Sequence, residues 1–237
     1  MAARRDRTVR ALAFALLLGG GAVASAHAQV APSASEIAAY TGLHAAAQHG
    51  DTATIDRLAA SAPKAALDAR DGHGRTPLHV AAFARQRDAV RALVRVGATT
   101  GALDDDRYDA VTITAVADDQ ETLGILLAGG ASARLITSRY DGTALIAAAH
   151  LGHDGVVRQL IAAGAPLDHV NNLHWTATIE AVVLGDGGAR HQSTLAALLK
   201  AGANPQLADR DGRTPLQLAR ARGYGEMASM LAAAGAR

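Results

Sequence analysis

The stretch Thr76-Pro77-Leu78-His79-Val80-Ala81-Ala82 decides the fold, because the chain repeats it at a near-constant interval. A second sharp copy is Thr214-Pro215-Leu216-Gln217-Leu218-Ala219. The softer copies begin at Thr41, Asp109, Thr143 and Thr176. The steps between successive starts are 35, 33, 34, 33 and 38 residues. Repeats at this interval predict a stack of similar units, because such self-similarity is typical of solenoid proteins.

A Gly-Ala pair recurs in phase with the motif. The pairs begin at Gly97, Gly130, Gly164, Gly202 and Gly235. Ahead of the first pair, Val90, Leu93 and Val94 are spaced three and four apart, which predicts a helix with one buried face. A glycine directly after such a helix is typical of a left-handed C-cap. Each unit is therefore predicted to contain a finger, an inner helix, a tight turn and an outer helix.

The interval and the Thr-Pro-Leu-His-x-Ala pattern resemble the ankyrin repeat. The resemblance covers residues 41–237 as about six units, which start near residues 41, 76, 109, 143, 176 and 214. It implies an all-α solenoid with short β-hairpin fingers, and residues 29–40 are expected to form a leader helix with Ser33 and Glu36 as its capping box. It also implies a monomer without a cofactor that binds another protein on the concave side formed by fingers and inner helices. An enzyme is not expected.

The N-terminus has the pattern of an export signal at residues 1–28. Four arginines precede the apolar run 11–18, and Ala26-His27-Ala28 offers a cleavage site before Gln29. The run is too short for a permanent membrane anchor of ordinary length. We therefore expect a periplasmic or secreted protein, with an uncleaved anchor as the alternative.

The charge balance gives no motive for binding nucleic acid. The whole chain has a formal net charge of +1, but residues 1–28 hold four arginines and one aspartate. Their removal leaves 19 basic and 21 acidic residues, so the mature chain lacks the basic surface that nucleic acids attract. The chain has no cysteine, so its fold depends on packing without disulfides.

Histidines and acidic runs raise the question of a metal site. His44 and His79 occupy the motif position that links neighbouring units in ankyrin repeats, so a structural role is expected for both. His150 and His153 are separated by Gly152 and lack a nearby third ligand, and the run 104–106 lacks the spacing of a calcium loop. No metal is therefore expected.

The unit that starts at Thr176 carries five extra residues, Asp186 to Arg190, expected as a loop between its two helices. An enzyme reading would use Glu180 or His191 in this unit as an acid or base, but no nucleophile or phosphate-loop motif accompanies them. The unit, with residues 171–175 before it, also resembles exported bacterial ankyrin proteins, some of which are associated with catalases. That resemblance implies an alternative role as accessory or inhibitor of one exported enzyme, such as a catalase helper or a toxin-neutralising partner.

The candidate protein-binding residues are mostly aromatic. Aromatic side chains are scarce in this chain and are enriched at interface hot spots. The predicted binding residues are Phe83, Tyr108, Tyr140, His174, Trp175, Arg190 and His191. Packing of the rings between adjacent fingers is the alternative interpretation.

Overall fold

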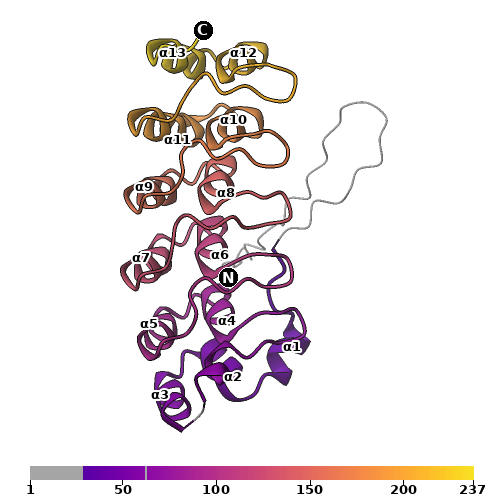
Figure 1. Cartoon of the computed structure of the whole chain (residues 1–237), viewed down its shortest axis with the longest axis vertical. Coiled ribbons are helices and arrows are strands. Elements are labelled where there is room, and N and C mark those ends of the chain that lie inside the picture. Colours follow the sequence, from indigo (N-terminus) through magenta and orange to yellow (C-terminus); the bar gives the residue numbers. More distant parts are fainter. Residues whose placement is uncertain (1–28, 62) are drawn as a thin grey trace, which may run out of the picture. The chain divides into compact units, whose positions relative to one another are not determined.

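The computed structural model describes residues 29–61 and 63–237, so the signal peptide predicted at residues 1–28 lies outside the described residues. Within residues 31–237, six helix pairs follow one another in a stack, with the inner and the outer helices in separate layers (Figure 1). The inner helices are α2 (Gly42–His49), α4 (Pro77–Phe83), α6 (Ala110–Val116), α8 (Ala144–His150), α10 (Ala177–Val183) and α12 (Pro215–Ala221). The outer helices are α3 (Thr52–Ser61), α5 (Arg87–Val96), α7 (Gln120–Ala128), α9 (Asp154–Ala162), α11 (Ala189–Lys200) and α13 (Gly225–Ala233). The predicted all-α solenoid is confirmed.

Each inner helix starts at the motif residue because a side-chain oxygen there satisfies an otherwise unpaired backbone N–H. The hydroxyl oxygens of Thr143 and Thr176 accept from the backbone N–H three residues later, at 3.3 and 3.2 Å. In unit three, where the motif threonine is missing, the Asp109 carboxylate accepts from the Thr112 N–H at 2.8 Å. Unit three therefore keeps its helix start despite its divergent sequence.

Each of the five Gly-Ala pairs ends an outer helix as predicted. The five glycines have φ angles between 79° and 95° in the left-handed region, which glycine adopts without strain from a Cβ. After this reversal the chain returns to the finger side of the stack (Figure 1).

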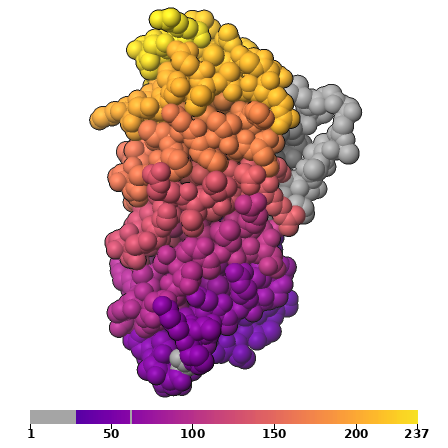
Figure 2. All heavy atoms as spheres, viewed as in Figure 1, coloured from indigo at the N-terminus to yellow at the C-terminus, as the bar shows by residue number. Residues whose placement is uncertain are grey.

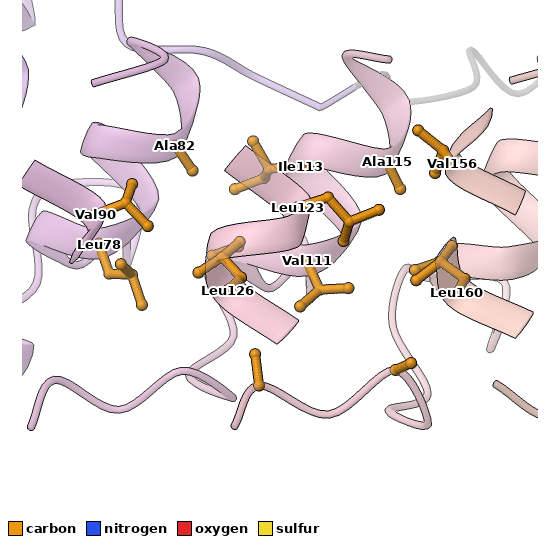
Figure 3. Packing of buried hydrophobic residues seen from close by; sticks show 14 of the residues in the cluster. Leu78, Ala82, Val90, Val111, Ile113, Ala115, Leu123, Leu126, Val156 and Leu160 are labelled. Carbon is orange, nitrogen blue, oxygen red and sulfur yellow. The ribbon is translucent and has the colours of Figure 1, made fainter. Parts of the chain in front are cut away.

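The core runs along the stack as equivalent positions of successive units. Inner helices pack on neighbouring inner helices and outer on outer, with leucines filling the space between them (Figure 3). One fully buried outer-helix position is occupied by Leu93, Leu126, Leu160 and Leu198. Burial of such a side chain stabilises the fold by roughly 1.5–3 kcal/mol. In the space-filling view the units follow one another without a gap on this face (Figure 2).

The motif histidines join consecutive units, as predicted. The Thr76 N–H donates to Nδ1 of His79 at 3.1 Å, so the proton of this neutral ring lies on Nε2. That Nε2 donates to the Tyr108 carbonyl, just ahead of the next inner helix, at 3.0 Å. His44 makes the same contact from unit one, with its Nε2 3.0 Å from the Arg75 carbonyl oxygen.

The fingers are turns, so the expectation of β-hairpins is wrong in detail. Within the described ranges, the β pairing is limited to an isolated bridge between Thr137 and Gly142. The reason is that a side-chain oxygen at the base of each finger takes up the backbone N–H groups that a hairpin would pair.

The five-residue insertion is only partly a loop, which corrects the expectation from sequence. Ala189 and Arg190 begin α11, which has 12 residues, and the connection from α10 runs from Leu184 to Gly188. Gly187 has a φ of 72°, and a Cβ there would lie 2.6 Å from the ring of Tyr224 in unit six. The insertion therefore packs against the stack, because a glycine lets the backbone approach that ring.

The leader contains α1 (Ala34–Ala39), and the predicted capping box is present. The Ser33 N–H donates to the Glu36 carboxylate at 2.8 Å, and the Ser33 hydroxyl oxygen accepts from the Glu36 N–H at 3.3 Å. Glu36 also forms an ion pair with the buried Arg75, and Tyr40 donates to Asp71 at 2.7 Å. These contacts tie the leader to the finger of unit two. The five-residue 3₁₀ helix η1 (Lys64–Asp68) precedes that finger.

Burial of His79 predicts a pH dependence of folding. Burial lowers the pKa of this imidazole from 6.5 to about 4, so the unfolded chain takes up the proton first as the pH falls. Stability should therefore decrease between pH 6.5 and pH 4, by about 2 kcal/mol between pH 7 and pH 5. His79→Gln should remove this slope, because Gln217 accepts the equivalent N–H from Thr214 at 3.0 Å in unit six. Urea unfolding of both proteins across this range is the measurement, and parallel stability curves would refute the assignment.

Two threonines at one position of the outer helix predict opposite effects of valine. Both side chains are fully buried. The Thr194 hydroxyl has no hydrogen-bond partner among the described residues, whereas the Thr122 hydroxyl donates to Asp119 at 2.7 Å. Thr194→Val should raise the free energy of unfolding by about 1 kcal/mol, and Thr122→Val should lower it by a similar amount. Thermal unfolding of both variants tests this, and a loss of stability in Thr194→Val would contradict it.

Candidate protein-binding surface

The fingers, defined as the nine residues before each motif start, share one turn. Fingers two to six are residues 67–75, 100–108, 134–142, 167–175 and 205–213. Five residues before the start, one side-chain oxygen accepts the backbone N–H groups two and four residues later. In finger five, Asn171 Oδ1 accepts from Leu173 at 3.0 Å and from Trp175 at 2.9 Å. The equivalent acceptors are Asp71, Asp104, Ser138 and Asp209.

The turn also dictates a left-handed residue two positions before each start. Gly74 and Gly212 occupy it in fingers two and six, whereas Arg107, Asp141 and His174 occupy it with φ angles of 66°, 53° and 63°. The exposure of His174, one of the predicted binding residues, is therefore imposed by the backbone of the turn.

Neighbouring fingers are joined by backbone hydrogen bonds. The N–H groups of Asp105, Ser138 and Asn172 donate to carbonyl oxygens of the preceding finger at 3.1, 2.9 and 2.9 Å. The side chains neutralise each other across the same boundaries. Arg139 pairs with Asp106 at 2.7 Å, and Arg107 pairs with Asp141 at 3.0 Å. Fingers three to five therefore form a continuous surface whose charges are largely satisfied within the chain.

Large apolar side chains are exposed on fingers four and five. Tyr140 and Leu173 share the same tip position, three before the motif start, and are 37% and 38% exposed. Ile136 and Val170 add exposures of 47% and 44% on the same two fingers. The other fingers carry His73, Asp106 and Asp211 at the tip position. We call Ile136, Tyr140, Val170 and Leu173 the finger patch.

Three of the predicted aromatic residues are half-buried. Phe83 and Tyr108 pack against the hydrophobic cluster of units one to five, and burial raises the pKa of the Tyr108 hydroxyl. Trp175 packs against a second cluster in units five and six. Tyr140 is the exposed member of the set. The four rings thus divide into one that faces solvent and three that also contribute to packing.

The two other predicted binding residues, Arg190 and His191, are engaged within the chain. Arg190 pairs with Asp118 of unit three at 2.7 Å. His191 lies 2.9 Å from both the Asp186 carboxylate and the His150 carbonyl oxygen. His153 makes the corresponding contact from unit four, with Nδ1 2.9 Å from the Ala115 carbonyl oxygen. The insertion therefore precedes a histidine that links units four and five.

The remaining polar candidates are also held by protein groups. Glu180, proposed as an acid or base in the enzyme reading, is buried, and its two oxygens contact Asn171 and His150. Asp104 of the acidic run accepts two backbone N–H groups in its turn, and burial raises its pKa. Among the described residues, no three histidine or acidic side chains gather as a metal ion would require. In the same residues, no helix has the length and apolar character needed to cross a membrane.

Sequence reasoning identified Tyr140 but missed Ile136, Val170 and Leu173. Isolated aliphatic residues in a repeat are normally read as core, and periodicity does not reveal which of them face solvent. Comparison of equivalent finger positions contains the missing signal, because polar residues stand at the tip of fingers two, three and six. The apolar tips of fingers four and five depart from that pattern.

Known proteins share both this sequence pattern and this structure. The family model described as ankyrin repeats (3 copies) matches residues 1–104 and 111–209. The ankyrin repeat protein YahD of Escherichia coli strain K12 is 35% identical over 192 residues, which cover 81% of this chain and 94% of that protein.

Solved structures agree with this assignment. An ankyrin repeat domain from Acinetobacter baumannii AYE has 45% identity and a TM-score of 0.77, covering 82% of this chain and 98% of that one. The ankyrin repeat protein EF0377 has 30% identity and a TM-score of 0.74, covering 81% and 98%. From the motif interval, the helix pairs and these matches together, the chain belongs to the ankyrin-repeat family.

Proposed function

We propose that this protein binds another protein through the finger patch and the adjoining side chains of His174 and Trp175. The observation that carries the proposal is the position of the exposed apolar side chains. Four of the six large hydrophobic residues exposed in the described structure lie on fingers four and five. Apolar surface concentrated on adjacent elements is typical of an interaction site, and tyrosine and tryptophan are frequent hot-spot residues.

The charges around the patch favour a partner with an apolar contact surface. Arg107, Asp141, Arg139 and Asp106 already pair with one another, so a partner gains little by offering opposite charge to them. Binding should then depend mainly on removing apolar area from water and should be little affected by salt. Catalysis and nucleic-acid binding are not part of this proposal, and we propose that the free protein is a monomer.

A second candidate function is a dedicated role beside one exported enzyme, as an accessory or an inhibitor. Two features specific to unit five favour it, the five-residue insertion and the exposed Leu173–His174 tip, since a general adaptor needs neither. Under this proposal the partner is an enzyme of the same compartment, such as a catalase or a toxin. Identification of the bound protein distinguishes the two functions.

The patch proposal predicts loss of binding without loss of fold. Tyr140→Ser with Leu173→Ser should abolish capture of the partner from an extract of the host, because two exposed apolar anchors are removed. The melting temperature should change little, since exposed substitutions usually alter stability by no more than about 0.5 kcal/mol. Affinity capture with mass spectrometry compares the variant with the unaltered protein.

Leu151→Ser is the matched control. Leu151 is 39% exposed but lies at the far end of α8, away from the fingers. The control should capture the same partner as the unaltered protein. Equal capture by the double variant would end the patch proposal, whereas equal loss in the control would show non-specific adhesion.

Export predicts a shortened mature protein. The arginine-rich start, the apolar run and the small residues at 26 and 28 favour cleavage after Ala28. N-terminal sequencing of protein from the periplasmic fraction should therefore begin at Gln29 or close to it. Recovery from the cytoplasm alone, with Met1 intact, would contradict export.

A further inference from the structure

Unit five has a buried acid where other units have an aliphatic core residue. Four positions after the motif start, Val80, Ile113 and Leu218 are buried in units two, three and six. Glu180 occupies this position in unit five and is 4% exposed. An acidic side chain is rarely buried unless other groups hold it, so its partners indicate its role.

The partners of Glu180 join a finger to a neighbouring helix. One carboxyl oxygen accepts from Asn171 Nδ2 at 3.1 Å, and the other lies 3.0 Å from His150 Nδ1 in unit four. The orientation of the Asn171 amide is set independently, because its Oδ1 accepts the N–H groups of Leu173 and Trp175. The amide therefore connects the turn of finger five to the carboxyl group on one side and to its own tip on the other.

The residue types at positions 171 and 180 match each other. Fingers two, three and six use Asp71, Asp104 and Asp209 where finger five has Asn171. An aspartate forms the same turn but has no N–H to donate, and it would bring a second carboxyl group against Glu180. Asparagine is the residue that keeps the turn and also supplies the donor.

Stability alone does not explain this arrangement. Replacing a buried polar network by apolar residues of similar volume is often neutral or stabilising, and the equivalent positions of units two, three and six show that an aliphatic residue fits here. What Glu180 adds is a fixed connection between finger five, α10 and α8. We propose that Glu180 is a positioning residue that holds finger five, and with it Leu173 and Trp175, in place for the partner.

This inference rests on the proposed function for its purpose, but its test needs no partner. Trp175 is the single tryptophan of the chain, so its fluorescence reports on finger five alone. Four proteins are compared: the unaltered chain, Asn171→Asp, Glu180→Leu, and the double variant. Melting temperature, Trp175 fluorescence quenching and amide hydrogen exchange are measured on each.

Asn171→Asp alone should lower the melting temperature, because two carboxyl groups then face each other. The double variant should recover it fully, since its unit five has the residues of an ordinary unit at both positions. In the double variant the Leu173 and Trp175 amides should nevertheless exchange about tenfold faster than in the unaltered chain, and Trp175 should be quenched more readily. The Asp106 and Tyr108 amides of finger three should not change.

Two further variants serve as controls. Glu180→Gln keeps an oxygen for Asn171 and should retain slow exchange in finger five. Ile113→Leu changes the equivalent core position of unit three and should leave finger five unaffected. Unchanged exchange and quenching in the double variant would overturn the proposal, as would faster exchange spread evenly over units four and five. Neither result would touch the finger patch, whose own test is partner capture.

Discussion

The stack depends on hydrogen bonds that run from one inner helix to the backbone at the start of the next. A single helix pair cannot bury its apolar faces, so every unit requires its neighbour in the correct register. Packing of alanines and leucines alone leaves that register loosely defined, because small side chains slide past one another at little cost. The contacts from His44 to the Arg75 carbonyl and from His79 to the Tyr108 carbonyl define it. They act directly ahead of each inner helix and so set the base of each finger as well.

Much of this architecture could be predicted from sequence because its signals are local. The motif starts and the Gly-Ala pairs mark where helices begin and end, and Asp109 could be placed by phase even without the motif threonine. Contacts between units were harder to predict. A carboxylate that closes a turn, as at Asp104, resembles a solvated acid or a cation ligand until its backbone partners are known. The helical start at Ala189 was hidden by the glycines just before it, which read as loop.

The candidate site was less accessible for the same physical reason. Which side of a finger faces solvent depends on a turn of five residues, and single-residue periodicity is too coarse to show it. Tyr140 was found because aromatic residues are scarce, whereas Leu173 was overlooked because leucine is common in the core. The polar departures of unit five, Asn171 and Glu180, are meaningful only as a pair, and nothing in their spacing of nine residues reveals that they meet. Local rules of core composition fail in this unit, as is typical of functional regions.

The pairing of Arg190 with Asp118 connects unit five to unit three and passes over unit four. The same guanidinium group also lies 3.8 Å from Asp154 of unit four. In a one-dimensional array whose energy is a sum over adjacent pairs, this contact is a second-neighbour term. Exposed ion pairs contribute only about 0.2–1 kcal/mol, so the term is small and weakens as salt is added. Its effect is on the distribution of partly unfolded states. Opening of unit four by itself also breaks a bond between its two neighbours, which favours the loss of units three, four and five as one block.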